Sequence, residues 1–261
     1  MKALELYQYL DARIPSSLSC EWDNDGLMCC SDPDREVKKV LLALDITEEV
    51  AETAVREGYD AIVSHHPLVF RPVNALNGAT GVQRKLIKLV KNDISVMSFH
   101  TRLDAVEGGV NDVLAKMLAL GDVEPFGPDG EKMGRIGTIP AALSLDVFAK
   151  CVGDVLGSPA VLYSGNKKVH RVAVLGGNGD DFISAAIAAG ADTFISGRLG
   201  YHPMTDAEES GINLIEAGHY YTERPVLSAL ADMLHKADGA IETVVVESNK
   251  ISCFQNDSLE K

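Results

Sequence analysis

Residues 37–64 read VKKVLLALDITEEVAETAVREGYDAIVS, and this stretch combines two apolar strands with a helix between them. Lys39–Leu44 is an apolar run with the length of one strand, and Ala61–Ser64 begins a second strand. Between them, Thr47 can cap the start of a helix and Gly58 can end it. The order strand, helix, strand predicts an α/β unit whose strands run parallel in one sheet.

Residues 169–196, VHRVAVLGGNGDDFISAAIAAGADTFIS, repeat this pattern without a gap. The identical pairs include Val40 with Val172, Ala54 with Ala186, Gly58 with Gly190, Asp60 with Asp192, and Ser64 with Ser196. A second alignment, residues 96–104 over 215–223, places His100 on His219 and Asp104 on Glu223. Two such units facing each other would bring the carboxyl ends of their strands to a shared crevice, where α/β sheets bind ligands.

The rest of the chain fits around these two units. We expect further helices at Gln83–Lys91, Gly109–Leu120 and Leu145–Leu156, strands at Ile94–Phe99, Arg135–Pro140 and Val161–Tyr163, and a loop at Pro125–Gly130. The predicted fold is α/β, with two similar lobes at residues 1–125 and 126–261 and a metal site in the cleft between them. Residues 126–168 would connect the lobes through short strands and a helix.

Composition narrows the class of protein. The 261 residues carry 24 Lys and Arg against 38 Asp and Glu, a formal charge of -14, which disfavours nucleic acid as a partner. No stretch of about 20 apolar residues predicts a membrane span, and the N-terminus lacks the features of a signal peptide. We therefore expect a cytoplasmic location and no membrane partner. Five cysteines without a CxxC argue against a disulfide framework, and adjacent Cys29 and Cys30 are interpreted as reduced thiols rather than a soft-metal site.

Adjacent histidines give the clearest local signal for chemistry. The apolar strand at Ala61–Val63 runs directly into Ser64, His65, His66 and Pro67. Neighbouring side chains on an extended segment point in opposite directions, so one ion rarely takes both imidazoles. A pair of ions could take one each. The alternative is that one histidine packs in the core while the other is solvated.

Two further segments supply acids and imidazoles at comparable positions. Asp104 follows another apolar strand and is a candidate ligand, with a helix cap as the alternative role. His219 and Glu223 are spaced i, i+4, so on a helix they share one face, with a surface pair as the alternative. His100 could be a ligand, a residue that orients one, or a proton carrier. Such a mixed nitrogen and oxygen set suits zinc, iron, manganese or cobalt better than calcium.

The glycine-rich segment Gly176–Gly179 follows a strand and precedes a helix. A tight turn is the favoured interpretation, and contact between its backbone N–H groups and a phosphate is the alternative. The dinucleotide-binding fingerprint requires an acid about 20 residues later, where this chain has Arg198. NAD binding is therefore not expected.

Taken together, these motifs resemble the NGG-interacting-factor-three-like family, often labelled "GTP cyclohydrolase 1 type 2 homologue". The matching segments are Glu21–Leu27, Ser64–Pro67, His100–Asp104, Gly108–Asp112 and Gly218–Glu223, and the resemblance runs from about Leu4 to Phe254. It implies two α/β lobes, a dinuclear metal centre, and a ring-shaped homohexamer. It also implies that His65 and His66 bind different ions, that Asp104 binds one and His219 the other, and that Glu223 bridges them. His100 is not among the family's usual ligands. The short segment between the lobes matches the compact form of the family, which lacks an inserted domain.

The resemblance leads to two expectations about function. In the first, the chain is a metal-dependent hydrolase similar to GTP cyclohydrolase 1 type 2, acting on a nucleotide or related substrate through metal-activated water. His100 or His202 would carry protons, while Arg198, Gly176 and Gly179 would contact substrate phosphates. Arg198 stands where the family commonly has an acid, which bears on the substrate. In the second, the protein is a non-catalytic metal-binding scaffold, a metal store or carrier, or a protein-interaction ring.

Overall fold

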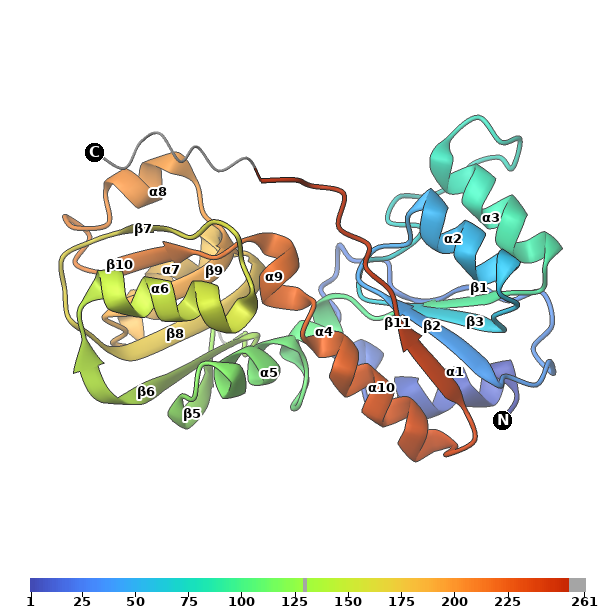
Figure 1. Cartoon of the computed structure of the whole chain (residues 1–261), viewed down its shortest axis with the longest axis horizontal. Helices are drawn as coiled ribbons and strands as arrows, with labels where there is room; N and C mark the ends of the chain where they lie inside the picture. Colours follow the sequence, from blue (N-terminus) through green and yellow to red (C-terminus); the bar gives the residue numbers. More distant parts are fainter. Residues whose placement is uncertain (129–130, 254–261) are drawn as a thin grey trace.

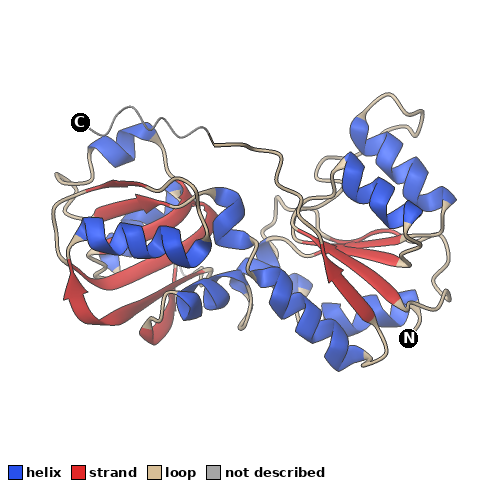
Figure 2. Ribbon diagram, viewed as in Figure 1, coloured by secondary structure: helices blue, strands red, loops and turns tan. Residues whose placement is uncertain are grey.

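A computed structural model describes residues 1–128 and 131–253 of the chain. Two mixed α/β lobes lie side by side, each built around its own sheet (Figure 1). Helices cover both faces of each sheet (Figure 2). The predicted α/β class with two lobes is confirmed.

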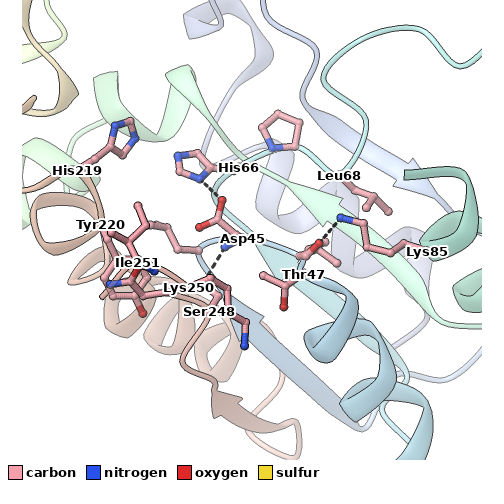
Figure 3. A pocket seen from close by; sticks show the side chains of 14 residues that line it. Asp45, Thr47, His66, Leu68, Lys85, His219, Tyr220, Ser248, Lys250 and Ile251 are labelled. Atoms are coloured by element: carbon pink, nitrogen blue, oxygen red, sulfur yellow. Dashed lines mark hydrogen bonds and ion pairs between the residues drawn. The ribbon is translucent and has the colours of Figure 1, made fainter. Parts of the chain in front are cut away.

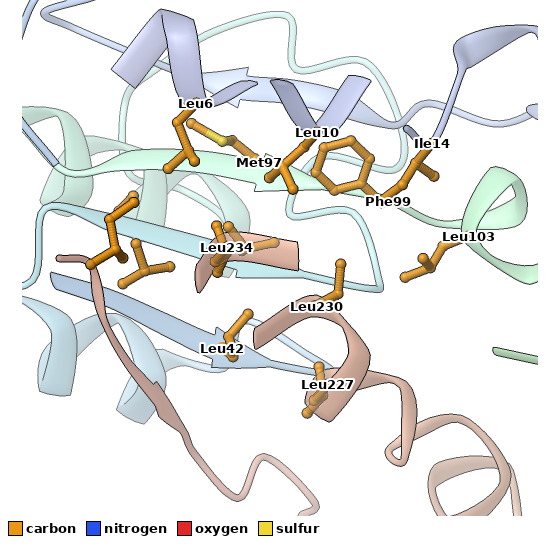
Figure 4. Close-up of a cluster of buried hydrophobic side chains, with 14 of the residues drawn as sticks. Leu6, Leu10, Ile14, Leu42, Met97, Phe99, Leu103, Leu227, Leu230 and Leu234 are labelled. Atoms are coloured by element: carbon orange, nitrogen blue, oxygen red, sulfur yellow. The ribbon is translucent and has the colours of Figure 1, made fainter. Parts of the chain in front are cut away.

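The first sheet has five strands in the order β1-β4-β3-β2-β11. These strands are β1 (Gly26–Cys29), β2 (Lys39–Ala43), β3 (Ala61–Ser64), β4 (Ser95–Ser98) and β11 (Glu242–Val245). All neighbours pair in parallel except β1, which runs antiparallel to β4. On one face lie α2 (Glu48–Arg56) and α3 (Gly81–Lys91), and on the other lie α1 (Ala3–Asp11) and α10 (Val226–Ala237). Figure 4 shows the core under α1 and α10, where Leu6 and Leu10 meet Met97 and Phe99.

The second sheet has six strands in the order β5-β6-β8-β9-β10-β7. They are β5 (Gly121–Phe126), β6 (Gly134–Leu143), β7 (Leu162–Ser164), β8 (Val169–Asn178), β9 (Thr193–Arg198) and β10 (Asn213–Glu216). The central strands β8, β9 and β10 are parallel. One face packs against α5 (Val110–Met117) and α6 (Leu145–Leu156), and the other against α7 (Ile183–Ala188). The short helices α4 (Thr101–Ala105), α8 (Tyr201–Thr205) and α9 (His219–Glu223) follow β4, β9 and β10.

The first alignment of the internal repeat is confirmed residue by residue. Val40 pairs with Ala61 in the first sheet, and their counterparts Val172 and Thr193 pair in the second. The aspartates that coincide in the repeat make the same contacts. Asp60 accepts hydrogen bonds from the backbone nitrogens of residues 38 and 39, and the carboxylate of Asp192 accepts them from residues 170 and 171. The two lobes therefore share one strand–helix–strand unit down to how the strands begin.

The second alignment is displaced by one residue. β4 (Ser95–Ser98) and β10 (Asn213–Glu216) pair with equivalent residues of β3 and β9. The helices that follow, α4 and α9, begin at Thr101 and His219. Thr101 rather than His100 is thus the counterpart of His219, and Ala105 rather than Asp104 is the counterpart of Glu223. Matching histidine to histidine gave the neighbouring register, because the sequence does not show where the strands pair.

The sheets also correct the predicted division of the chain at residue 125. β5 (Gly121–Phe126) runs across this position as an edge strand of the second sheet, in place of the start of the loop predicted at Pro125–Gly130. Residues 129 and 130 of that loop lie outside the described residues, as does Phe254. At the other end, α10 and β11 return to the first lobe, where β11 pairs with β2 and α10 buries apolar residues of its inner face. Apolar contact with the first sheet decides where these last elements pack.

Within the described part of the chain, the longest helices have 12 residues, and none has the length and apolar character needed to cross a membrane.

Candidate metal centre between the lobes

His65 and His66 follow β3 directly and so lie at the carboxyl end of the first sheet. Nδ1 of His65 is 2.9 Å from the carbonyl oxygen of Phe99. A carbonyl only accepts hydrogen bonds, so this nitrogen carries the proton and Nε2 keeps its lone pair. Nδ1 of His66 is 2.7 Å from Oδ1 of Asp45, at the end of the neighbouring strand β2. Each ring is therefore held through Nδ1 with Nε2 free for a ligand, as in histidine metal sites.

A carboxylate reaches His65 from α4. Oδ1 of Asp104 is 3.7 Å from Nε2 of His65, and the Asp104 side chain is almost completely buried. The start of α4 is tied down by Asp23, which accepts hydrogen bonds from the backbone nitrogen and hydroxyl of Thr101 and lies 2.9 Å from Nδ1 of His100. Burial opposes ionisation of Asp23, but the hydrogen bonds from His100 and Thr101 outweigh it and hold its pKa well below the usual range.

The second lobe contributes α9. His219 and Glu223 are its first and last residues, so the predicted i, i+4 pair on one helix face is confirmed. Nε2 of His219 lies 3.0 Å from Oε2 of Glu223. The same carboxylate also reaches the first lobe: its Oε2 is 3.0 Å from Nε2 of His66, and its Oε1 is 3.7 Å from Nε2 of His65. Glu223 thus lies between the two histidines of the other lobe.

These contacts form two groups of three potential ligands that share one carboxylate. The groups are His65, Asp104 and Glu223, and His66, His219 and Glu223. Within each group the ligand atoms lie within 4.8 Å of one another. His100 joins His65 and His66 in a third group, with its ring centroid 5.3 Å from that of His65. The structure therefore brings together all five residues that the sequence nominated as ligands, with His100 beside them.

The buried polar atoms fit a cation. Nε2 of His65 and Oδ1 of Asp104 are buried and make no hydrogen bond within the described residues, and Oε2 of Glu223 is buried with only the two imidazole nitrogens of His66 and His219 beside it. Leaving buried polar groups without a full set of partners is costly, and divalent ions in the two groups would satisfy these atoms. Two carboxylates and three imidazoles are donors of the kind that zinc, iron, manganese and cobalt accept.

The pKa values of the clustered side chains are shifted by burial and by their neighbours. Burial, together with the negative charge of Glu223, raises the pKa of Asp104. Burial also opposes ionisation of Glu223, but three histidines around it outweigh that effect and lower its pKa. For His66, burial favours the neutral ring, yet Asp45 and Glu223 together raise its pKa to about 10. A hydrogen bond to Glu223 also raises the pKa of His219, so the buried carboxylates favour positive charge on the neighbouring imidazoles.

The glycines of Gly176–Gly179 have a role that the sequence did not reveal. Backbone hydrogen bonding keeps β8 in the sheet to Asn178, so the predicted tight turn is wrong, although the strand is irregular there. A Cβ atom on Gly177 would lie 2.3 Å from Oε1 of Glu223, and one on Gly176 would lie 3.2 Å from Cγ of the same residue. These glycines make room for the side chain of Glu223.

The other predicted contact residues lie at the end of β9 and in α8. Arg198 is the last residue of β9 and is exposed, and its side chain makes no ion pair among the described residues. His202 lies in α8, is exposed, and packs its ring against Tyr201. Neither belongs to the groups of potential metal ligands in the described part of the chain. Their roles in substrate contact and proton transfer stay predictions.

Comparison with known proteins identifies the family of this chain. The sequence profile of one family, described as Duf34/NIF3 (NGG1p interacting factor 3), matches residues 1–251. The chain belongs to the Duf34/NIF3 family. A Clostridium perfringens relative named "GTP cyclohydrolase 1 type 2 homolog" is 33% identical over 258 residues, covering 96% of this chain and 98% of the relative. A Methanocaldococcus jannaschii relative with the same name is 35% identical over 229 residues, covering 85% of this chain and 90% of the relative.

Solved structures of similar NIF3 proteins have the same fold. The Staphylococcus aureus protein SA1388, titled a hypothetical protein, superimposes with a TM-score of 0.86 and 30% identity, covering 98% of this chain and 99% of that one. Reduced HcgD from Methanocaldococcus jannaschii superimposes with a TM-score of 0.82 and 30% identity, covering 95% of this chain and 98% of that one. The two-lobed architecture is therefore that of the NIF3 family.

Several residues around the candidate centre have roles that the sequence did not assign. Asp45 orients His66, and its signal was an acid at the end of the strand beside the one that carries the histidines. Asn111 joins the lobes: its Nδ2 donates to the carbonyl oxygen of Asp104, and its Oδ1 accepts from the backbone nitrogen of Gly176. On the surface, Trp22 and Phe70 pack their rings against His100, each with a centroid distance of 6.2 Å.

A cavity of about 480 Å³ opens beside the centre (Figure 3). His66 and His219 form one side of it, and residues of the β2–α2 loop, of α3 and of the chain after β11 form the rest. Its size is that of a small-molecule site. One of the two ligand groups therefore faces a space that a substrate could enter.

Proposed function

We propose that this chain holds two divalent metal ions between its lobes and hydrolyses a small-molecule substrate there. The observation that carries the proposal is the pair of ligand groups that share Glu223. A carboxylate shared by one imidazole–carboxylate pair and one pair of imidazoles is the arrangement expected of a dinuclear centre. When bound, two such ions polarise a substrate and lower the pKa of a water molecule toward neutrality.

The residues of the chain divide the work of this site. His65 and Asp104 would hold one ion, His66 and His219 the other, and Glu223 would bridge them. The carbonyl of Phe99 and the carboxylate of Asp45 fix the two imidazoles so that each offers Nε2. These supports come from the first sheet, so the ligand rings would need little rearrangement on loading.

His100 is placed to hold and move a proton at Nε2. Its Nδ1 is engaged by Asp23, and its ring lies between the histidine ligands and the surface rings of Trp22 and Phe70. A histidine held by a buried carboxylate is a general acid–base arrangement. The relatives are named GTP cyclohydrolase 1 type 2 homologs, so a guanine nucleotide is the first substrate to test. In that reaction water would attack the C8 carbon of the guanine ring, and hydrolysis would release formate.

The metal site is tested by metal content. Protein purified without chelator or immobilised nickel should contain close to two divalent ions per chain by plasma mass spectrometry. Glu223→Gln should lose both ions because both ligand groups use this carboxylate. Asp104→Asn and His219→Ala should each lose one. His235→Ala is the matched control, because His235 lies in the last turn of α10, outside these groups, and should keep both ions. A folded wild-type chain that is purified without metal and does not bind added zinc, iron, manganese or cobalt would contradict the proposal.

Catalysis is tested separately on the loaded protein. GTP and a panel of phosphoesters and cyclic amides should include at least one compound that is turned over by wild-type protein and not by Glu223→Gln. Release of formate from GTP would identify the cyclohydrolase reaction. A protein that holds two ions and turns over none of these compounds would instead support a metal-binding scaffold.

A further inference from the structure

The cavity beside the candidate centre is lined by one cation, Lys85, that no described residue neutralises through an ion pair. Three charged groups besides the histidines line it: Asp45, Lys85 and Lys250. Asp45 pairs with His66, and Lys250 pairs with Glu49. Lys85 has a different partner: its Nζ donates to the carbonyl oxygen of Ile46 and makes no ion pair among the described residues. The charge of Lys85 is therefore left for something that enters the cavity.

Another lysine on the same helix, Lys88, shows that acidic side chains lie close enough to α3 to form ion pairs. Lys88 lies one turn further along and pairs with both Glu48 and Glu52, at 2.8 and 3.0 Å. Lys85 is partly buried, and burial lowers its pKa despite the nearby acids Glu48 and Asp45. The chain has a formal charge of -14, so acidic side chains are plentiful. A partly buried lysine that forms no ion pair with any described carboxylate is therefore unexpected. It is the environment that an anionic ligand group would complete.

The rest of the lining describes the remainder of the ligand. Figure 3 shows Lys85 and Thr47 on one side of the cavity and His66 and His219 on the other. Apolar and aromatic side chains also line the cavity: Ile46, Leu68, Tyr220 and Ile251. Figure 3 shows Asp45, which bonds to His66, between the two ends. A molecule in the cavity could thus meet a cation, an apolar wall and the candidate metal ligands at once.

We propose that Lys85 binds an oxyanion group, phosphate or carboxylate, of a small organic substrate whose reacting group faces His66 and His219. The inference rests on the proposed function for the reacting end of the substrate, but the anion subsite itself needs only the cavity and Lys85. It assigns the anion contact to α3 of the first lobe. An Nζ group with one hydrogen bond to a carbonyl retains two N–H donors for an oxyanion.

Titration with inorganic phosphate tests the subsite directly. The probe is added to protein as purified and after removal of metal by chelator, and binding is followed by calorimetry. Lys85→Met should weaken phosphate binding at least tenfold in the metal-free protein, while Lys85→Arg should restore most of it. Lys88→Met is the matched control: it removes the same charge from the same helix, outside the cavity, and should change affinity less than twofold.

The outcomes separate this inference from the metal proposal. Phosphate affinity that is unchanged in Lys85→Met, or lowered equally in Lys88→Met, overturns the subsite even if two ions are present. Lys85-dependent binding in a chain that never takes up metal supports the subsite and contradicts the dinuclear centre. Acetate and malonate, titrated in parallel, identify the oxyanion: tighter binding of these than of phosphate, still dependent on Lys85, makes the substrate group a carboxylate.

Discussion

The two lobes share a strand–helix–strand unit, yet they use equivalent positions in opposite ways. At the strand ends the first lobe places side chains that hold or orient a metal, whereas the second lobe places glycines at two of the three positions and an exposed arginine at the third. The corresponding pairs are Asp45 with Gly177, His65 with Gly197, and His66 with Arg198.

The glycines explain how the second lobe still contributes ligands. A Cβ atom on Gly197 would lie 2.6 Å from Oγ1 of Thr222 and 2.7 Å from Cα of His219. Because Gly177 and Gly197 have no side chains, α9 packs closely over β8 and β9. This packing brings His219 and Glu223 toward the histidines of the first lobe. One lobe thus supplies ligands from its strand ends, and the other clears its strand ends so that a helix can supply them. A repeated fold gives an asymmetric site.

The largest loss of stability should follow from Arg102, which stands in α4 where α9 has Tyr220. Its guanidinium is buried and bonds to Asp11 and Asp25. Arg102→Met would leave the buried carboxylate of Asp25 without its cation and should lower the free energy of unfolding by about 3–5 kcal/mol. Urea unfolding measures this. Arg56→Met, an exposed arginine in α2, should cost less than about 0.5 kcal/mol. Equal effects of the two changes would mean that the buried network contributes nothing.

Asn111→Ala should have the next largest effect, because this side chain joins the lobes. It is fully buried and bonds to the backbones of Asp104, Met133 and Gly176. The alanine would remove the side-chain partner of the buried backbone groups of Asp104 and Gly176, whereas the carbonyl of Met133 keeps its bond from Arg135; the expected cost is about 2–4 kcal/mol in urea unfolding. Asn166→Ala is the surface control, since the Asn166 side chain is exposed and bonds to Glu208 alone among the described residues. A loss confined to a few tenths of a kcal/mol would show that the lobes do not depend on this bridge.

Gly177→Ala sharpens the comparison further, because it should separate stability from metal binding. Gly177 has φ +71°, so alanine should cost about 1–2 kcal/mol from backbone conformation alone. Its Cβ would also displace Oε1 of Glu223, so metal content should fall. Gly157→Ala is the matched control, with φ +65° and no atom within 4 Å of the added Cβ. It should show the same stability loss and keep its metal, and equal metal content in the two variants would refute the role given to Gly177.

Thr47→Ala should have the smallest effect of the four. Oγ1 of Thr47 accepts the backbone N–H of Val50 at the start of α2, a cap that its counterpart Gly179 cannot make. Its loss should cost about 1 kcal/mol by urea unfolding. Ser144→Ala, at a helix start where the hydroxyl makes no cap bond, should cost clearly less. If the two changes cost the same, the cap at α2 is not what distinguishes the lobes there.

The sequence allowed prediction of whatever depends on local pattern. β3 was placed at the residues observed, α6 likewise, and the i, i+4 spacing of His219 and Glu223 revealed one helix face. The failures came from information that a sequence does not carry. Gly177 was interpreted as part of a turn because the space needed by Glu223 is visible only after folding. The hydrogen bond of Asp45 to His66 and that of Lys85 to the carbonyl of Ile46 likewise join residues that are far apart in the sequence.

One further consequence comes from Trp22, the only tryptophan in the chain. Its indole is 64% exposed, and its centroid lies 6.2 Å from the ring of His100, beside the candidate metal ligands. All tryptophan emission therefore comes from one fluorophore next to the site. Indole emission depends on its surroundings, so we expect a rearrangement of the His100 ring to change it. Trp22 therefore offers an unlabelled optical signal with which metal loading of the candidate centre can be tested.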